Sequence, residues 1–317
     1  PKARMTKSAA ELQLADAPTT VLLSTTGRAV RVDVEPGTTI ATPARRSKHD
    51  GIVAALETTT RTEIGAVTSR GRVVRFTPID VPAVPAASVQ LGAGVRIADY
   101  LGITDRSEKV LALIRFDDET PLALGTKDGV VKRVVPATLA VRPELEIIGL
   151  KPKDVVIGAA PAPDAAELVF VTSDAQLLHF AAAQVRPQGA PAGGMAGVKL
   201  GAGAEVIAFN VVDPTEETVV VTVSGAEGML AGTDSGRAKV SLFSEFPGKG
   251  RATGGVRAHA FLKGEDRLRL AWVGPGPARA LGTDGAARSL PDAGAKRDGS
   301  GQPLDAVVGS VGRAIGA

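Results

Sequence analysis

The stretch AVTSRGRVVRF at residues 66–76 is the part of the sequence that decides the fold. An apolar segment ends in threonine, a glycine follows within a short turn, and a second segment then places arginines beside valines. Glycine supplies the positive φ angle that tight hairpin turns require, and β-branched residues favour the flanking strands. The stretch therefore predicts a β-hairpin with basic side chains on its second strand.

The same pattern recurs five more times along the chain. The copies are LLSTTGRAVRV at 22–32, LGTKDGVVKRV at 124–134, VTSDAQLLHF at 171–180, GTDSGRAKV at 232–240 and GTDGAARSL at 282–290. Their threonines run from position 25 to position 283, a mean spacing of roughly 52 residues, which is typical of propeller blades of about four strands. Ala175 replaces the glycine of the fourth copy, so a turn of a different type is expected there.

The composition agrees with an all-β fold. Among 317 residues there are 37 glycines and 21 prolines, most of them between short β-branched runs, which is typical of many strands joined by tight turns. Hydrophobic residues make up 44% of the chain and aromatic residues only 3%, so the core is expected to consist of aliphatic side chains.

These observations predict one domain of six blades over residues 19–317, preceded by a helical tail or linker at 1–18. The expected blades, with boundaries uncertain by several residues, cover approximately 19–63, 64–120, 121–167, 168–217, 218–277 and 278–317.

Other features exclude several classes of protein. The chain has no cysteine, so disulfides, thiolate metal sites and a cysteine nucleophile are impossible. It has no apolar run long enough to cross a membrane, and a cytoplasmic protein without membrane contact is expected. The net charge of +3 says little by itself about a nucleic-acid partner, so the placement of the charges matters more.

Catalytic chemistry has little support in the sequence. His49, His179 and His259 fall in different repeats without a second ligand at metal spacing. The segment GKGRATG at 248–254 lacks the Gly-Lys-Ser/Thr ending of a phosphate loop, and Tyr100 has no Arg-Arg pair or acidic triad nearby. We therefore expect no catalytic residue, metal or cofactor in this chain.

Lysine and arginine recur at two places in the repeats: on the strand after the turn and in the loop that follows. The most basic loops read ARRSKHDG at 44–51, VRPQG at 185–189 and FPGKGR at 246–251. Glycine lets a backbone approach a phosphate closely, and the cations neutralise it. Any single loop could be a solvated edge, but the recurrence favours DNA contact by Arg45, Arg46, Lys48, Arg72, Arg75, Lys132, Arg133, Arg186, Lys249, Arg251 and Arg257.

The repeated hairpin, together with the segments at 186–198 and 246–257, resembles the C-terminal domain of DNA gyrase and topoisomerase IV A subunits over residues 19–317. The resemblance implies a β-pinwheel, a propeller-like disc whose blades exchange strands and whose basic perimeter bends duplex DNA. It also implies a nucleoid-associated parent enzyme, a heterotetramer that uses ATP and Mg²⁺. A separate ATPase subunit, together with the breakage-reunion domain that precedes this domain in the same polypeptide, would be the partners.

One departure from the family concerns the first loop. Gyrase carries a Gln-Arg-Arg-Gly-Gly-Lys-Gly box there, whereas RRSKHDG at 45–51 keeps the charge and the last glycine but lacks the Gln, the glycine pair and the Lys before that last glycine. We therefore expect a topoisomerase IV-like parent, with a chirally wrapping gyrase as the alternative.

Two interpretations from other classes remain. A protein-binding propeller scaffold is possible, although the Trp-Asp and Gly-His pairs of WD40 blades are absent and only two Gly-Gly pairs occur. A propeller hydrolase would gather carboxylates or histidines at a central channel, and the sequence offers no such set.

Overall fold

A computed structural model describes residues 15–215, 217–228 and 235–317 of the chain. The helical tail expected at 1–18 lies almost wholly outside the described residues; 15–17 have no regular structure and Pro18 begins the first strand. Nearly all regular structure that is described is β. The exceptions are one turn of helix, α2 (Ile97–Tyr100), and the 3-10 turns Pro78–Asp80, Ala86–Ser88, Leu91–Ala93, Pro136–Thr138, Ala182–Gln184 and Phe243–Glu245.

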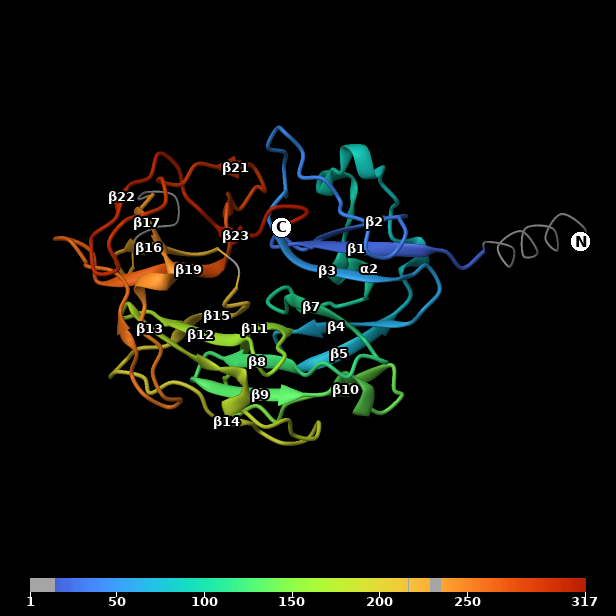
Figure 1. The fold of residues 1–317 in the computed structure, drawn as a ribbon, viewed down its shortest axis with the longest axis horizontal. Coiled ribbons are helices and arrows are strands. Elements are labelled where there is room, and N and C mark those ends of the chain that lie inside the picture. Colours follow the sequence, from blue (N-terminus) through green and yellow to red (C-terminus); the bar gives the residue numbers. More distant parts are fainter. Residues whose placement is uncertain (1–14, 216, 229–234) are drawn as a thin grey trace, which may run out of the picture.

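Six sheets follow one another around a disc in sequence order (Figure 1). Three strands of each sheet come from one repeat, and the third of these lies innermost, with the first and then the second outside it. The strands are β1 (Pro18–Ser24), β2 (Arg28–Val32) and β3 (Ile52–Thr59); β4 (Ile64–Thr68), β5 (Arg72–Phe76) and β7 (Val110–Arg115); β8 (Leu122–Thr126), β9 (Val130–Val134) and β11 (Val156–Pro161); β12 (Glu167–Thr172), β13 (Gln176–Ala181) and β15 (Val206–Val212); β16 (Thr218–Gly225), β17 (Arg237–Leu242) and β19 (Arg267–Pro275); β20 (Arg279–Leu281), β21 (Ala287–Arg288) and β23 (Ser310–Gly312).

The outermost strand of each of the first five sheets is donated by the next repeat. These donated strands are β6 (Val95–Arg96), β10 (Glu144–Glu146), β14 (Met195–Ala196), β18 (Val256–Arg257) and β22 (Gln302–Pro303). The sixth sheet contacts the first repeat, since the amide of His49 donates to the carbonyl oxygen of Gly285 at 2.8 Å. The predicted six-bladed, strand-exchanging fold is confirmed.

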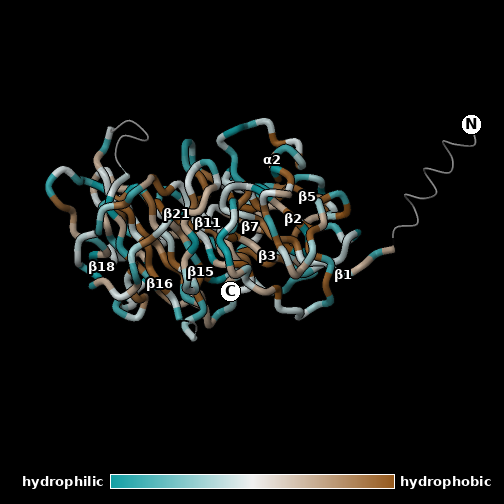
Figure 2. The backbone as a smooth tube through the Cα atoms, turned by 90° about the horizontal axis from the view of Figure 1, so that it is seen from above, coloured by the Kyte–Doolittle hydropathy of each residue, from teal (hydrophilic) through white to brown (hydrophobic). Residues whose placement is uncertain are grey.

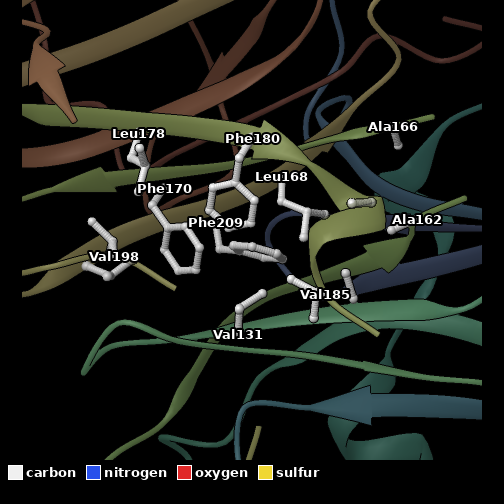
Figure 3. Close-up of a cluster of buried hydrophobic side chains, with 13 residues drawn as sticks. Val131, Ala162, Ala166, Leu168, Phe170, Leu178, Phe180, Val185, Val198 and Phe209 are labelled. Atoms are coloured by element: carbon white, nitrogen blue, oxygen red, sulfur yellow. The ribbon is translucent and has the colours of Figure 1, made fainter. Parts of the chain in front are cut away.

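The core lies between neighbouring sheets. Figure 3 shows the cluster between the third and fourth sheets, where Phe170, Phe180 and Phe209 meet Leu168 and Val198. The other clusters are mainly aliphatic, as the composition predicts. Figure 2 shows the apolar segments inside the disc and polar ones on its outer loops. The innermost strands line a central cavity of about 520 Å³.

One expectation about the turns is wrong, and a second, which concerns Thr233, lies outside the described residues. Ala175 has a φ of 60°, close to the 73° of Gly71. Its amide donates to the carbonyl oxygen of Thr172, just as the amide of Gly71 donates to that of Thr68. The fourth turn therefore has the same type, with alanine held in the left-handed region. In the fifth repeat the first strand of the hairpin ends at Gly225, well before Thr233. Residues 229–234 lie outside the described part of the chain.

Glycine at the start of a donated strand lets that strand reach its neighbour. Gly255 has a φ of +76°, and a Cβ there would lie 2.5 Å from the carbonyl oxygen of Leu177. Gly194 is similar, with a φ of +81° and the carbonyl oxygen of Val131 at 2.6 Å. Strand exchange thus depends on backbone contacts that a side chain would block.

We expect Gly255→Ala to lower the free energy of unfolding by about 2–4 kcal/mol, because alanine is strained at positive φ and its methyl group overlaps β13. Gly254→Ala is the matched control, since a Cβ there would lie 3.9 Å from the carbonyl oxygen of Lys199, an ordinary contact distance. Urea unfolding of both variants measures the difference. Equal loss of stability in the two would contradict this account of strand exchange.

Candidate nucleic-acid interface

The rim of the disc consists of the donated strands and the loops that lead to them. Each such loop starts after the outer strand of its own repeat and ends on the sheet of the preceding repeat. We call these segments rim loops; they cover residues 33–51, 77–94, 135–143, 182–194, 243–255 and 289–301. The candidate DNA-contacting residues lie on the rim loops, on the donated strands or on the outer strands beneath them.

Lys132 and Arg133 are removed from the candidates by burial. Lys132 is 0% exposed, and its ammonium donates to the carbonyl oxygens of Ile147, Gly189, Ala190 and Ala192 at 2.7–2.8 Å. Arg133 is 1% exposed and donates to Asp164 at 2.6 Å and to two rim-loop carbonyls. The prediction of phosphate contact is wrong for both, because their charges hold the fourth rim loop against β9.

Arg72 and Arg75 are also engaged within the protein. Arg72 forms a bidentate ion pair with Glu108, at 2.8 and 2.9 Å, and a further one with Glu144 at 2.5 Å. The hydrogen bonds from Arg72 to Glu108 raise the pKa of Arg72. Arg75 lies over the ring of Phe116, 3.4 Å from its centroid, and its side chain is 9% exposed. Neither guanidinium is available to a phosphate without losing these partners.

The first rim loop closes the ring. Arg46 forms a bidentate pair with the buried Asp50, at 2.7 and 2.8 Å, and donates to the carbonyl oxygen of Ala280 in the sixth sheet at 2.9 Å. His49 lies beside Gly285 and bonds Thr26 at 2.8 Å. Burial, together with Arg28 and Lys48, lowers the pKa of His49. Arg46 therefore serves as a latch between the first and sixth blades.

Arg45 and Lys48 flank this latch and are exposed to solvent. Both therefore remain candidates for phosphate contact. They are the two exposed cations of the first rim loop.

The remaining candidates gather on two adjacent rim loops. Arg186 lies in the fourth, Lys249 and Arg251 lie in the fifth, and Arg257 lies on β18. The loops touch, since Arg251 donates to the carbonyl oxygen of Ala196 at 2.6 Å and the amide of Ala252 bonds Gly197 at 2.7 Å. Arg186, Lys249 and Arg257 are exposed, whereas Arg251 is half-buried.

Lys199 belongs to the same surface but was not among the predicted residues. It is exposed, and its amide donates to the carbonyl oxygen of Thr253 at 3.0 Å, so it lies where the two loops meet. Arg96, on β6, is a second exposed cation that was missed. The recurring triplet of glycine, valine and a basic residue, at 94–96, 197–199 and 255–257, could have identified both. We call Arg186, Lys199, Lys249, Arg251 and Arg257 the basic arc.

The fifth sheet contains a second buried lysine, Lys239. Lys239 donates to the carbonyl oxygens of Lys296, Arg297 and Gly299, repeating in the fifth sheet the arrangement around Lys132. Burial lowers the pKa of Lys132 and of Lys239 to about 8. The surrounding carbonyl oxygens oppose this effect because they stabilise the ammonium form.

The groups considered for catalysis have structural roles where the chain is described. The hydroxyl of Tyr100 donates to the carbonyl oxygen of Thr77 at 2.9 Å, and its ring meets Phe76 edge-on. No helix follows the segment at 248–254. Among the described residues, no cluster of three or more acidic or histidine side chains could hold a metal ion, and no helix is long and apolar enough to cross a membrane.

We expect Arg46→Ala to destabilise the protein by about 2–4 kcal/mol, because it leaves the buried carboxylate of Asp50 without its cation and unties the first blade from the sixth. Arg45→Ala, at the exposed neighbouring position, should change stability by less than about 0.5 kcal/mol. Thermal unfolding compares the two. Similar melting curves for both variants would exclude the latch.

The buried His259 predicts a specific loss of stability in acid. Its pKa is lowered from 6.5 to about 4, first by burial and then by Lys239 and Arg237. Between these values the unfolded chain binds a proton that the folded protein does not, so stability falls as the pH drops from 6.5 to 4, by about 3 kcal/mol.

His259→Asn retains an acceptor for Thr222, which bonds Nδ1 of His259 at 2.9 Å, and removes the titration. The difference in unfolding free energy between wild type and variant should shrink across that pH range. Parallel pH profiles would show that His259 does not titrate as described.

Comparison with known proteins agrees with this architecture. A family model described as the DNA gyrase C-terminal domain, beta-propeller, matches residues 166–213 and 229–268. The A subunit of DNA gyrase from Dehalogenimonas lykanthroporepellens is 27% identical over 60% of this chain and 22% of its own length. The topoisomerase subunit TopoM of Mycolicibacterium smegmatis is 37% identical over 35% of this chain and 14% of its own length. The chain thus spans a small part of these relatives.

Among solved structures, the C-terminal domain of DNA topoisomerase IV superposes with a TM-score of 0.69, covering 94% of both chains at 20% identity. This likeness concerns the fold, while the relatives and the family model carry the sequence relationship. Taken together, they show that the chain is similar, in sequence over these segments and in fold over most of its length, to the C-terminal domains of type IIA topoisomerase A subunits.

Proposed function

We propose that this chain binds duplex DNA on its rim and bends it, without catalysing a reaction itself. The observation that carries the proposal is the basic arc. Its five cations lie on two adjacent glycine-rich rim loops and the donated segments that follow them, and among the described residues none of them forms an ion pair with a carboxylate. The fifth rim loop has one carboxylate, Glu245, which accepts a hydrogen bond from the backbone amide of Arg297 at 2.8 Å.

Exposed cations on glycine-rich backbone suit phosphates better than base edges. Each phosphate neutralised releases condensed counterions, so affinity falls steeply with salt and depends little on sequence. Bending 20–30 bp of DNA by 40–90° costs about 1–6 kcal/mol, which several such contacts can offset. The arc therefore favours non-specific binding of a bent duplex.

The parent protein is proposed from the relatives. On this proposal the chain is one domain of a nucleoid-associated, cytoplasmic type II topoisomerase that requires ATP and Mg²⁺. DNA cleavage belongs to the breakage-reunion domain of the same polypeptide, whereas ATP hydrolysis belongs to a partner subunit. We favour a topoisomerase IV-like parent over gyrase, since the degenerate box uses Arg46 for the latch and leaves only Arg45 and Lys48 exposed.

Replacing Arg186, Lys249 and Arg257 together by alanine should weaken binding to duplexes of unrelated sequence by a similar factor. If all three contact phosphates, the slope of log affinity against log salt should fall by about 2.7. Fluorescence anisotropy with a labelled duplex at several salt concentrations measures both.

The matched control removes three exposed cations from the loops that lead to the inner strands, Arg106, Lys151 and Lys263. Equal losses in the two triple variants would mean that net charge, rather than the arc, sets the affinity. Retention of the wild-type slope by the arc variant would contradict the proposal.

A separate experiment distinguishes a topoisomerase IV-like parent from a gyrase. Nicked plasmid is religated with increasing amounts of the protein, and its linking number is measured on chloroquine gels. A topoisomerase IV-like domain should bind without shifting the linking number. A shift would show chiral wrapping and favour a gyrase-like role.

A further inference from the structure

The donated strands allow the rim to be compared at one register position in five sheets. The position is the residue that pairs with the first residue of the outer strand. It is held by Arg96 opposite Arg28, Glu146 opposite Arg72, Ala196 opposite Val130, Arg257 opposite Gln176, and Pro303 opposite Arg237. Within these five described pairings, Glu146 is the one acidic residue.

The second sheet has further negative charge at its edge. Glu144 lies two residues from Glu146 on the same short strand, so both side chains point to the same side of β10. Both are exposed, and Glu144 pairs with Arg72, whose charge is already shared with Glu108. The rim loop before β10 supplies one cation, Arg142.

The neighbouring third sheet has the opposite character. The rim loop that covers it, together with the residues up to Lys199, contains Arg186 and Lys199 and no acidic residue. The first sheet, on the other side, presents Arg96. The change in sign thus falls between the second and third sheets, directly beside the basic arc.

We propose that DNA bound on the basic arc leaves the rim at the second sheet, where Glu144 and Glu146 repel its phosphates, so that the bound duplex follows an open arc instead of a closed circuit. This inference rests on the proposed function. Carboxylates at the edge of a phosphate-binding surface raise the local cost of bringing a polyanion close. Glu146 therefore marks one end of the DNA path.

A pair of equivalent positions can report on the two sides of this boundary. Ala137 and Ala183 are exposed at the same point of successive repeats, and their amides donate to the carbonyl oxygens of Asp118 at 3.0 Å and Asp164 at 3.2 Å. Because the sequence has no cysteine, Ala137→Cys and Ala183→Cys each create a unique thiol for a photoactivatable cross-linker. Cross-linking to a long duplex then shows which rim loop lies beside DNA.

We expect cross-links from Ala183→Cys and none from Ala137→Cys. Adding Glu146→Arg to Ala137→Cys should produce cross-links there, because it places arginine at the register position of Arg96 and Arg257. Adding Glu146→Gln should give a weaker gain. The charge-matched control adds Glu265→Gln, a carboxylate of the loop before β19, and should leave Ala137→Cys without cross-links.

Other outcomes would overturn the inference. Equal cross-linking at both cysteines in the otherwise wild-type protein would show that the second sheet is no boundary. Cross-linking at neither cysteine, while DNA is still bound, would place the duplex elsewhere. Absence of DNA binding in all of these proteins, measured separately by anisotropy, would instead reject the proposed function.

Discussion

In the first five sheets of this disc the outer strand is paired with a strand from the following repeat, and most of the structure depends on that exchange. A blade left with three strands would expose a row of unpaired amides and carbonyls at its edge. The donated strands cover those edges, and each connection crosses from one blade to the next. The close backbone approaches at Gly194 and Gly255 are the local condition for this arrangement.

The exchange also explains why so many basic residues are buried or paired. A rim loop that returns to the preceding sheet ends with carbonyl oxygens pointing inward, and Lys132 and Lys239 satisfy them with ammonium groups. Arg133 satisfies two further carbonyl oxygens of the rim loop that Lys132 holds, and Arg46, in the first rim loop, donates to the carbonyl oxygen of Ala280 on β20. Positive charge in the repeats thus has two separate uses, and only the part that remains on the surface can attract a polyanion.

The sequence predicted the repeats well and the individual contacts less well. The hairpins could be recognised because a threonine, a turn and a glycine indicate a local conformation within about ten residues. The burial of Lys132 could not, because its carbonyl partners at Gly189 and Ala192 come from loops 57 and 60 residues further along the chain. Ala175 was misjudged since a well-packed turn can hold alanine at positive φ despite the strain. Arg186, Lys249 and Arg257 lie on the exposed rim, and the pairing of their loops became visible only in three dimensions.

We infer that one sector of the rim, made by the fourth and fifth repeats, carries the DNA. Amide hydrogen exchange with and without a duplex tests it most directly, because it reports on every rim loop at once. Exchange should be slower at 182–199 and 243–257 when DNA is present, with no change at 135–146. Protection spread evenly around all the rim loops, or confined to segments away from the rim, would contradict it.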